Sequence, residues 1–69
     1  MRMIEVEGID RDGESRSVSF VVSGPTWMLA ADLLDDGWRY ARLSRDGATV
    51  GEVYFDQARL CRTWRMSGA

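Results

Sequence analysis

The sequence predicts an α+β fold in which one central helix packs on one face of an antiparallel sheet of four to five strands. An amphipathic segment lies at residues 26–36, and runs of alternating apolar and polar residues lie on both sides of it. Asp-Gly pairs separate several of those runs, as in tight turns. Strands and helices that are segregated along a chain in this way are typical of the α+β class.

The helix over residues 26–36 has the clearest pattern. Gly24 and Pro25 precede it, and proline suits the first turn because its missing N–H would have no partner there. Ser23 or Thr26 is expected to supply the capping oxygen, and Gly37 to end the helix in the left-handed conformation. At about 100° per residue, one apolar face is shared by Trp27, Ala30, Ala31, Leu33 and Leu34, with Leu29 at its edge.

Two strands are expected before the helix. Residues 4–7 alternate between apolar and acidic side chains, which predicts a half-buried strand. Asp12 and Gly13 are a hairpin signal. The chain then returns over residues 17–22 with three apolar side chains on the inner face, namely Val18, Phe20 and Val22.

Two further strands are expected after the helix, at residues 38–44 and 48–55, because both runs alternate and are rich in aromatic or β-branched residues. Residues 45–47 (Arg-Asp-Gly) predict a turn between them. Gly51 inside the second run indicates a bulge or a close neighbour.

Residues 57–66 fit either a final strand or a short helix. In a helix, Asp56 would provide the cap; in a strand, Leu60, Arg62 and Trp64 would share a face. We favour the strand, because a third consecutive hairpin partner needs the shortest connection. The expected order is therefore ββαββ followed by one more element.

All 69 residues are expected to form one small domain, with residues 67–69 as a loose tail. A chain of this length buries only about 60% of its unfolded surface, so its core is thin. Cys61 is the single cysteine, which excludes a disulfide within the chain and indicates a reducing compartment. Because Cys61 lies among apolar residues, we expect a buried, inert thiol.

Cytoplasmic localisation without a membrane partner is expected. The N-terminus becomes acidic at Glu5 and lacks the apolar run of a signal peptide. No segment approaches the ~20 apolar residues of a membrane span. The chain begins at Met1, and we expect it to be a complete small gene product.

Enzymatic chemistry is not expected. The chain has no histidine or lysine, which removes the usual general bases. One cysteine without histidine cannot assemble the nitrogen and sulfur ligands that zinc prefers. The acidic turn at residues 10–14 lacks the spacing of an EF-hand, and no glycine-rich phosphate loop is present. The sequence therefore predicts no catalytic residue, no metal site and no cofactor.

The charges are divided unevenly along the chain, although the formal net charge is only −2. Residues 1–36 hold three arginines and eight acids, whereas residues 37–69 hold six arginines and three acids. Asp35 and Asp36 lie in the last helical turn, where the helix dipole disfavours negative charge by roughly 0.3–1 kcal/mol each. Either Arg39 or Arg42 neutralises them, or the small protein tolerates the cost, or they form an acidic patch for a basic partner.

Binding to another protein is the function that the sequence favours. The chain is rich in arginine, tryptophan, tyrosine and methionine, which are enriched at interfaces. We expect an accessory protein of the kind that phages and mobile elements encode as inhibitors or modulators of host proteins. A homodimer, in which the acidic half of one copy meets the arginine-rich half of another, is a second form of this hypothesis. The candidate partner-binding residues lie on the polar side of the helix: Met28, Asp32, Asp35 and Asp36.

Nucleic-acid binding is the alternative function. Arginines and aromatic residues interleave in the second half of the chain, and such residues neutralise phosphates and stack bases. The acidic sequence pI of about 4.9 argues against it. So does the need of a small domain for its three tryptophans in the core. The candidate residues are Arg39, Tyr40, Arg42, Arg45, Arg59, Arg62 and Arg65.

Overall fold

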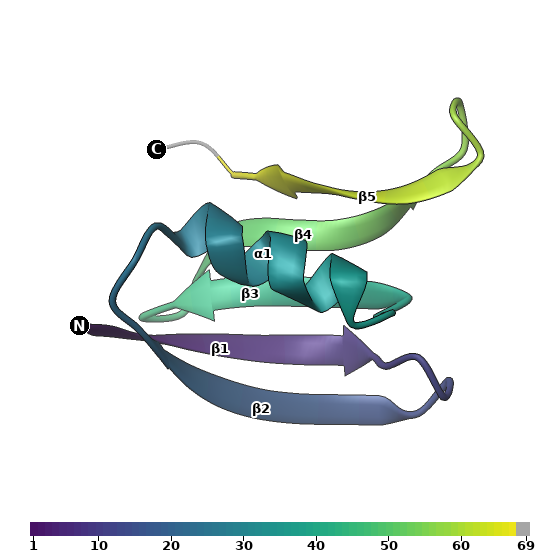
Figure 1. Cartoon of the computed structure of the whole chain (residues 1–69). Helices are drawn as coiled ribbons and strands as arrows, with labels where there is room; N and C mark the ends of the chain where they lie inside the picture. Colours follow the sequence, from purple (N-terminus) through teal and green to yellow (C-terminus); the bar gives the residue numbers. More distant parts are fainter. Residues whose placement is uncertain (68–69) are drawn as a thin grey trace.

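The computed structural model describes residues 1–67, which form a five-stranded antiparallel sheet and one helix (Figure 1). The sheet order is β2-β1-β3-β4-β5. The predicted α+β class is confirmed, and the last segment is a strand. Of the expected tail, residues 68 and 69 lie outside the described residues. In chain order the elements are β1 (Arg2–Ile9), β2 (Ser15–Val22), α1 (Thr26–Asp35), β3 (Tyr40–Arg45), β4 (Ala48–Asp56) and β5 (Cys61–Met66).

The helix ends as predicted but begins differently. Gly37 has a φ of 92°, the left-handed conformation that ends a helix. The N-cap residue is Pro25, and no side chain caps the helix, so the expected cap from Ser23 or Thr26 is wrong. The Thr26 hydroxyl instead accepts a hydrogen bond from Arg2 Nη2 at 3.0 Å. Because Arg2 belongs to β1, this bond ties the start of the helix to the sheet.

One apolar cluster joins α1 to the sheet, but the buried face of the helix is rotated from the predicted one. Leu29, expected at the edge, is 9% exposed, whereas Trp27 is 49% exposed. The reason is that Trp27 stacks on Trp64 of β5, with ring centroids 6.1 Å apart and planes 12° apart. The fully buried members of the cluster are Ile4, Val6, Leu29, Ala30, Leu33, Trp38, Ala41, Leu43 and Val53.

The helix makes its closest contacts with β4 and β5, and β2 at the far edge is less well covered (Figure 1). Ile4 and Val6 of β1 are each 1% exposed. The inner residues of β2 pack against the same cluster but are only half-buried. Their predicted orientation is confirmed, namely for Val18, Phe20 and Val22.

One hairpin turn and one bulge follow from particular residues. Asp46 and Gly47 both have positive φ, of 52° and 83°, as the predicted two-residue hairpin turn requires. Opposite Gly51 the pairing register shifts between Leu43 and Ser44, so the predicted bulge is present. A Cβ at Gly51 would also lie 2.9 Å from the Met66 sulfur, so a larger residue there would require the flexible Met66 side chain to shift.

Leu60, at the β4–β5 turn, has a φ of 57° and is 77% exposed. We predict that Leu60→Gly raises the free energy of unfolding by about 0.5–1 kcal/mol, because the left-handed penalty of a side chain exceeds the extra entropy of glycine. Urea denaturation followed by circular dichroism measures the change. Ala58→Gly in the same turn is the control, since Ala58 has no positive φ, and it should be destabilising. A Leu60→Gly chain no more stable than wild type contradicts the prediction.

Candidate functional site

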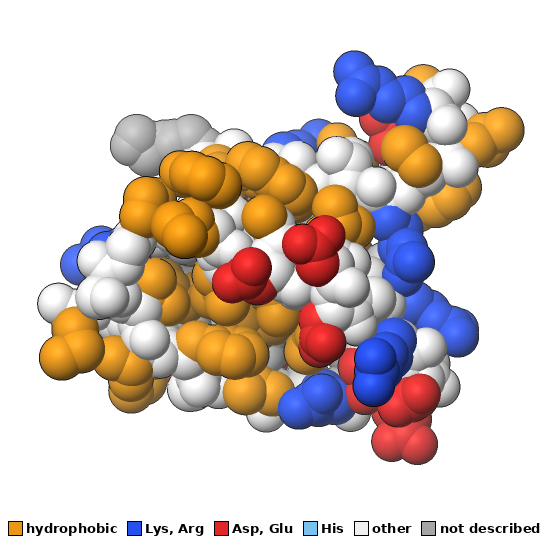
Figure 2. All heavy atoms as spheres, viewed as in Figure 1, with side chains coloured by type: hydrophobic (Ala, Val, Ile, Leu, Met, Phe, Trp, Pro, Cys, Tyr) orange, Lys and Arg blue, Asp and Glu red, His pale blue; other side chains and the backbone are white. Residues whose placement is uncertain are grey.

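A groove lies between α1 and β2. Its floor is formed by the half-buried Val18, Phe20 and Val22. Its helical wall carries Met28, Asp32 and Asp36, which follow at intervals of four residues and therefore face the same way. These six residues are called the α1–β2 groove below. Figure 2 shows carboxylates (red) over α1 and apolar side chains (orange) between α1 and β2.

Three of the four predicted partner-binding residues line this groove. Met28 is 48% exposed, and the carboxylates of Asp32 and Asp36 are exposed beside it. Asp35 is exposed as well but does not line the groove. The arrangement therefore places an apolar floor next to negative charge, which suits a partner with both apolar and basic side chains.

Within residues 1–67, the carboxylates of Asp32, Asp35 and Asp36 form no ion pair. Their expected neutralisation by Arg39 or Arg42 is therefore wrong. The reason is that both arginines are engaged elsewhere, one with Glu7 and one with a main-chain carbonyl. The last turn of α1 also carries no basic residue. The unfavourable interaction of the acidic side chains with the helix dipole is thus left uncompensated.

The seven arginine and tyrosine candidates for nucleic-acid binding do not share one surface. Arg42 and Arg65 lie on the sheet face opposite α1, and each pairs with an acid on the neighbouring strand. Arg42 Nη2 lies 2.7 Å from Glu7, and Arg65 pairs with Glu52. The hydrogen bond and the charge of Glu52 raise the pKa of the Arg65 guanidinium, which also lies 4.5 Å from the Tyr54 ring centre. Both positive charges are thus already neutralised.

The remaining candidates are separated further. Arg45 is the last residue of β3 and Arg59 lies in the β4–β5 turn, beside the carboxylates of Asp46 and Asp56 respectively. Trp38 is 2% exposed, so it cannot stack on a base. The structure thus divides the candidate nucleic-acid surface into separate places.

Arg39 and Arg62 do come together, with Arg11, at the end of the molecule where two turns and the helix C-terminus meet. Arg62 Nη1 donates to the Gly37 carbonyl at 2.8 Å, and Arg39 Nη2 donates to the Arg11 carbonyl at 3.3 Å. In the part of the chain that the structure describes, none of the three pairs with a carboxylate. The hollow between them, called the arginine hollow below, is lined by Arg11, Arg39, Arg62, Phe55, Leu60 and Cys61.

Sequence reasoning missed Arg11 and misplaced Cys61. Arg11 precedes the Asp12-Gly13 turn, and in the antiparallel sheet this turn lies at the same end as the helix C-terminus. This topology is the signal that could have placed Arg11 beside Arg39. Cys61 is exposed, so the predicted buried thiol is wrong. Its position at the first residue of an edge strand, directly after the exposed turn, explains the exposure.

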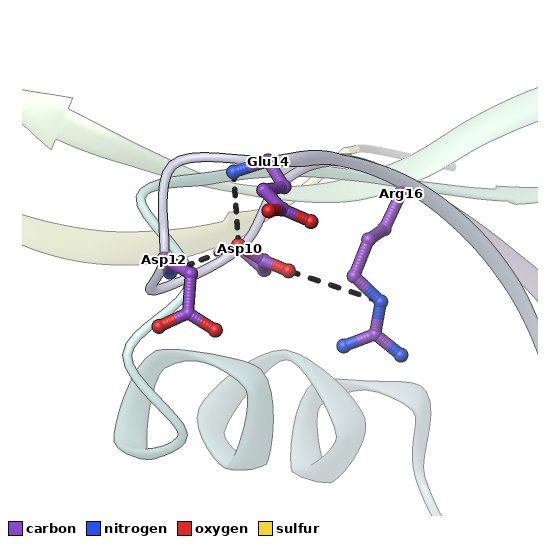
Figure 3. Close-up of polar contacts among 4 residues, drawn as sticks. All are labelled: Asp10, Asp12, Glu14 and Arg16. Atoms are coloured by element: carbon purple, nitrogen blue, oxygen red, sulfur yellow. Dashed lines mark hydrogen bonds and ion pairs between the residues drawn. The ribbon is translucent and has the colours of Figure 1, made fainter.

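The acidic turn at residues 10–14 is held by Asp10, which is 8% exposed. Its Oδ1 accepts hydrogen bonds from the N–H groups of Asp12 at 2.9 Å and Glu14 at 3.0 Å (Figure 3). Its Oδ2 lies 4.0 Å from Arg16 Nε. The carboxylate therefore shapes the turn. Among residues 1–67, no three cysteine or acidic side chains are grouped closely enough to hold a metal ion.

Comparison with protein-family models, curated proteins and solved structures finds no match for this chain. The one helix within residues 1–67 is neither long nor apolar enough to cross a membrane. Function must therefore be argued from the surface itself.

We predict that Asp10→Ala lowers the free energy of unfolding by about 1–2 kcal/mol, because the N–H groups of Asp12 and Glu14 lose a buried, charged acceptor. Asp12→Ala is the matched control in the same turn and should change it by less than about 0.5 kcal/mol. Urea denaturation of both variants measures the difference. Equal effects of the two substitutions would show that the Asp10 carboxylate does not hold the turn.

Proposed function

We propose that this chain is a small non-enzymatic protein-binding domain and that the α1–β2 groove is its docking surface. The observation that carries the proposal is the combination of exposed, unpaired carboxylates at Asp32 and Asp36 with the half-buried floor beside them. The proposed partner is a protein segment with apolar side chains flanked by lysine or arginine. In the cell, such a domain would act as a phage or mobile-element inhibitor or modulator that covers a basic surface of a host protein.

The energetics support this combination of features. Completing the burial of side chains such as Phe20 and Met28 stabilises a complex by about 25 cal/mol per Å² of apolar surface removed from water. The carboxylates contribute specificity and a faster association rate more than affinity. Asp35 and Asp36 reduce the stability of the free helix, and binding sites commonly retain such unfavourable groups.

We predict that Asp32→Asn, Asp35→Asn and Asp36→Asn in one chain leave the fold intact and raise its stability by roughly 0.3–1 kcal/mol for each carboxylate in the last turn. The same variant should lose binding to peptides that wild-type protein selects from a random display library. Those peptides should combine apolar residues with lysine or arginine. Thermal unfolding and fluorescence anisotropy measure the two effects.

The matched control removes three other carboxylates, through Glu5→Gln, Asp12→Asn and Glu14→Gln. These side chains are exposed, lie away from the groove and form no ion pair within residues 1–67. The control has the same net charge as the site variant and should bind the selected peptides like wild type. Peptides that bind the site variant and wild type equally would contradict the proposed surface.

Binding of single-stranded nucleic acid at the arginine hollow is the second candidate function. Three arginines without carboxylate partners surround Phe55, which is 51% exposed. Guanidinium groups neutralise phosphates, and an exposed aromatic ring can stack on a base. Of the arginines expected from the sequence, only Arg39 and Arg62 line this hollow.

We predict that Arg11→Gln with Arg39→Gln weakens the binding of a labelled single-stranded oligonucleotide at low salt. The logarithm of the association constant decreases with the logarithm of the salt concentration. The magnitude of this slope should become smaller by about 0.7 for each arginine removed. Arg45→Gln with Arg59→Gln has the same net charge and is the control. Fluorescence anisotropy over a salt series measures both. The absence of wild-type binding even at low salt would exclude this function and leave protein binding unaffected.

A further inference from the structure

The two edges of the sheet differ in how well they are protected. β5 has six residues, and its Arg62 points toward the α1 side, where it hydrogen-bonds to Gly37 and Trp38. Inward-pointing charges of this kind discourage further strand pairing. β2 has eight residues, pairs with β1 without a register shift, and contains neither proline nor lysine; its one charged residue, Arg16, lies near its start and also points toward the α1 side. A long and regular edge of this kind is a template for an added strand.

The main-chain groups of β2 alternate in direction. The Asp10 N–H donates to the Glu14 carbonyl at 2.9 Å, immediately beyond the paired residues Ile9 and Ser15. Because hydrogen-bonded and non-bonded pairs alternate along an antiparallel ladder, every second residue from Glu14 turns its N–H and C=O toward β1. The intervening residues turn these groups toward the open edge, namely Ser15, Ser17, Ser19 and Val21.

The side chains of β2 also favour the addition of a strand at this edge. On the α1 side, Val18 and Phe20 are only half-buried, since the helix lies toward β4 and β5. On the other side, Ser17 and Ser19 are small and exposed. An added strand would therefore bury apolar surface on one face and meet only serine and valine side chains of β2 on the other.

We propose that two copies of this chain pair antiparallel through β2, about a two-fold axis that passes between their Ser19 residues. In this register Ser19 opposes Ser19 of the second copy, and their free main-chain groups form a hydrogen-bonded pair. Val18 of each copy opposes Phe20 of the other, which gives two equivalent pairs. These are non-hydrogen-bonded pairs, in which opposed side chains lie closest together. The sheet then continues through both copies, with both helices on the same side.

Charge complementarity favours this register. Arg16 lies on the α1 side of β2, 5.5 Å from the Trp38 ring centre, and its side chain is 49% exposed. In the proposed pair it opposes Val22 of the second copy. Val22 lines a hollow together with Met28 and Asp32. An acidic side chain of the facing copy is thus available to each Arg16, in addition to its contact with Asp10 of its own chain.

This pairing uses the main-chain groups at the β2 edge, which the α1–β2 groove does not use, but it shares Val18, Phe20 and Val22 with that groove. Pairing and the binding of another protein in the groove would therefore compete. The pairing also differs from a dimer held by the acidic and arginine-rich halves of two chains, because hydrogen bonds and apolar contacts supply most of it.

Sedimentation over a series of concentrations tests the proposal. Wild-type protein should reach a mass twice that of the chain as its concentration rises. Ser19→Pro should stay monomeric and folded, because it removes an N–H that β1 does not use. Ser19→Lys should also stay monomeric, because it places two ammonium groups opposite each other. Ser19→Ala is the control and should pair like wild type.

A cross-linking experiment tests the register. In a Cys61→Ser background, Ser19→Cys should form a disulfide between copies on mild oxidation, because opposed Cα atoms in such a pair lie about 5.5 Å apart, within disulfide range. Ser17→Cys is the matched control and should not cross-link, since it opposes Val21 of the second copy. Monomeric wild-type protein at every concentration overturns the proposal. So does a dimer that persists in both Ser19→Pro and Ser19→Lys, or cross-linking that is stronger at Ser17→Cys.

Discussion

The stack of Trp27 on Trp64 holds the start of α1 against β5, and the exposed surface beside α1 follows from the position of the helix near β4 and β5. It joins the first turn of α1 to the edge strand β5 with nearly parallel rings. Aromatic pairs of this kind contribute about 0.5–1.5 kcal/mol beyond their buried area. A helix is about 10 Å wide and neighbouring strands are about 4.8 Å apart, so one helix covers roughly two strands. A five-stranded sheet must therefore leave part of that face open.

The open part is the side of β2, and this explains three features of the molecule together. The inner residues of β2 stay half-buried, a groove forms beside the helix, and the helix row with Met28 and Asp32 faces that groove. The same offset leaves the β2 edge accessible to another strand. The proposed docking surface and the proposed β2 pairing thus follow from the same constraint, and they share the inner residues of β2.

The sequence predicted the elements well because each depends on residues close together in the chain. Alternation over residues 4–7 and the Asp46-Gly47 pair are local signals, and the structure bears both out. The surroundings of the candidate site residues could not be predicted in this way, because they depend on contacts between residues that are far apart in sequence. Arg42 meets Glu7 only because β1 and β3 are neighbours, although β2 and α1 lie between them in sequence.

The wrong prediction of burial at Cys61 has the same cause: it used neighbours in sequence, whereas exposure depends on the position of the residue in the fold. Cys61 was expected to be buried because of its apolar neighbours in sequence, yet it is exposed, as is Leu60, because a hairpin turn carries both beyond the reach of the helix.

A domain near the lower size limit buries little apolar surface when it folds. The uncovered groove and the open β2 edge are therefore a large part of the surface that it leaves exposed. Association that buries them stabilises the folded state in proportion to the logarithm of partner concentration. Binding and folding are therefore coupled in this chain: the surfaces that weaken the isolated domain are those through which a partner, or a second copy, would stabilise it.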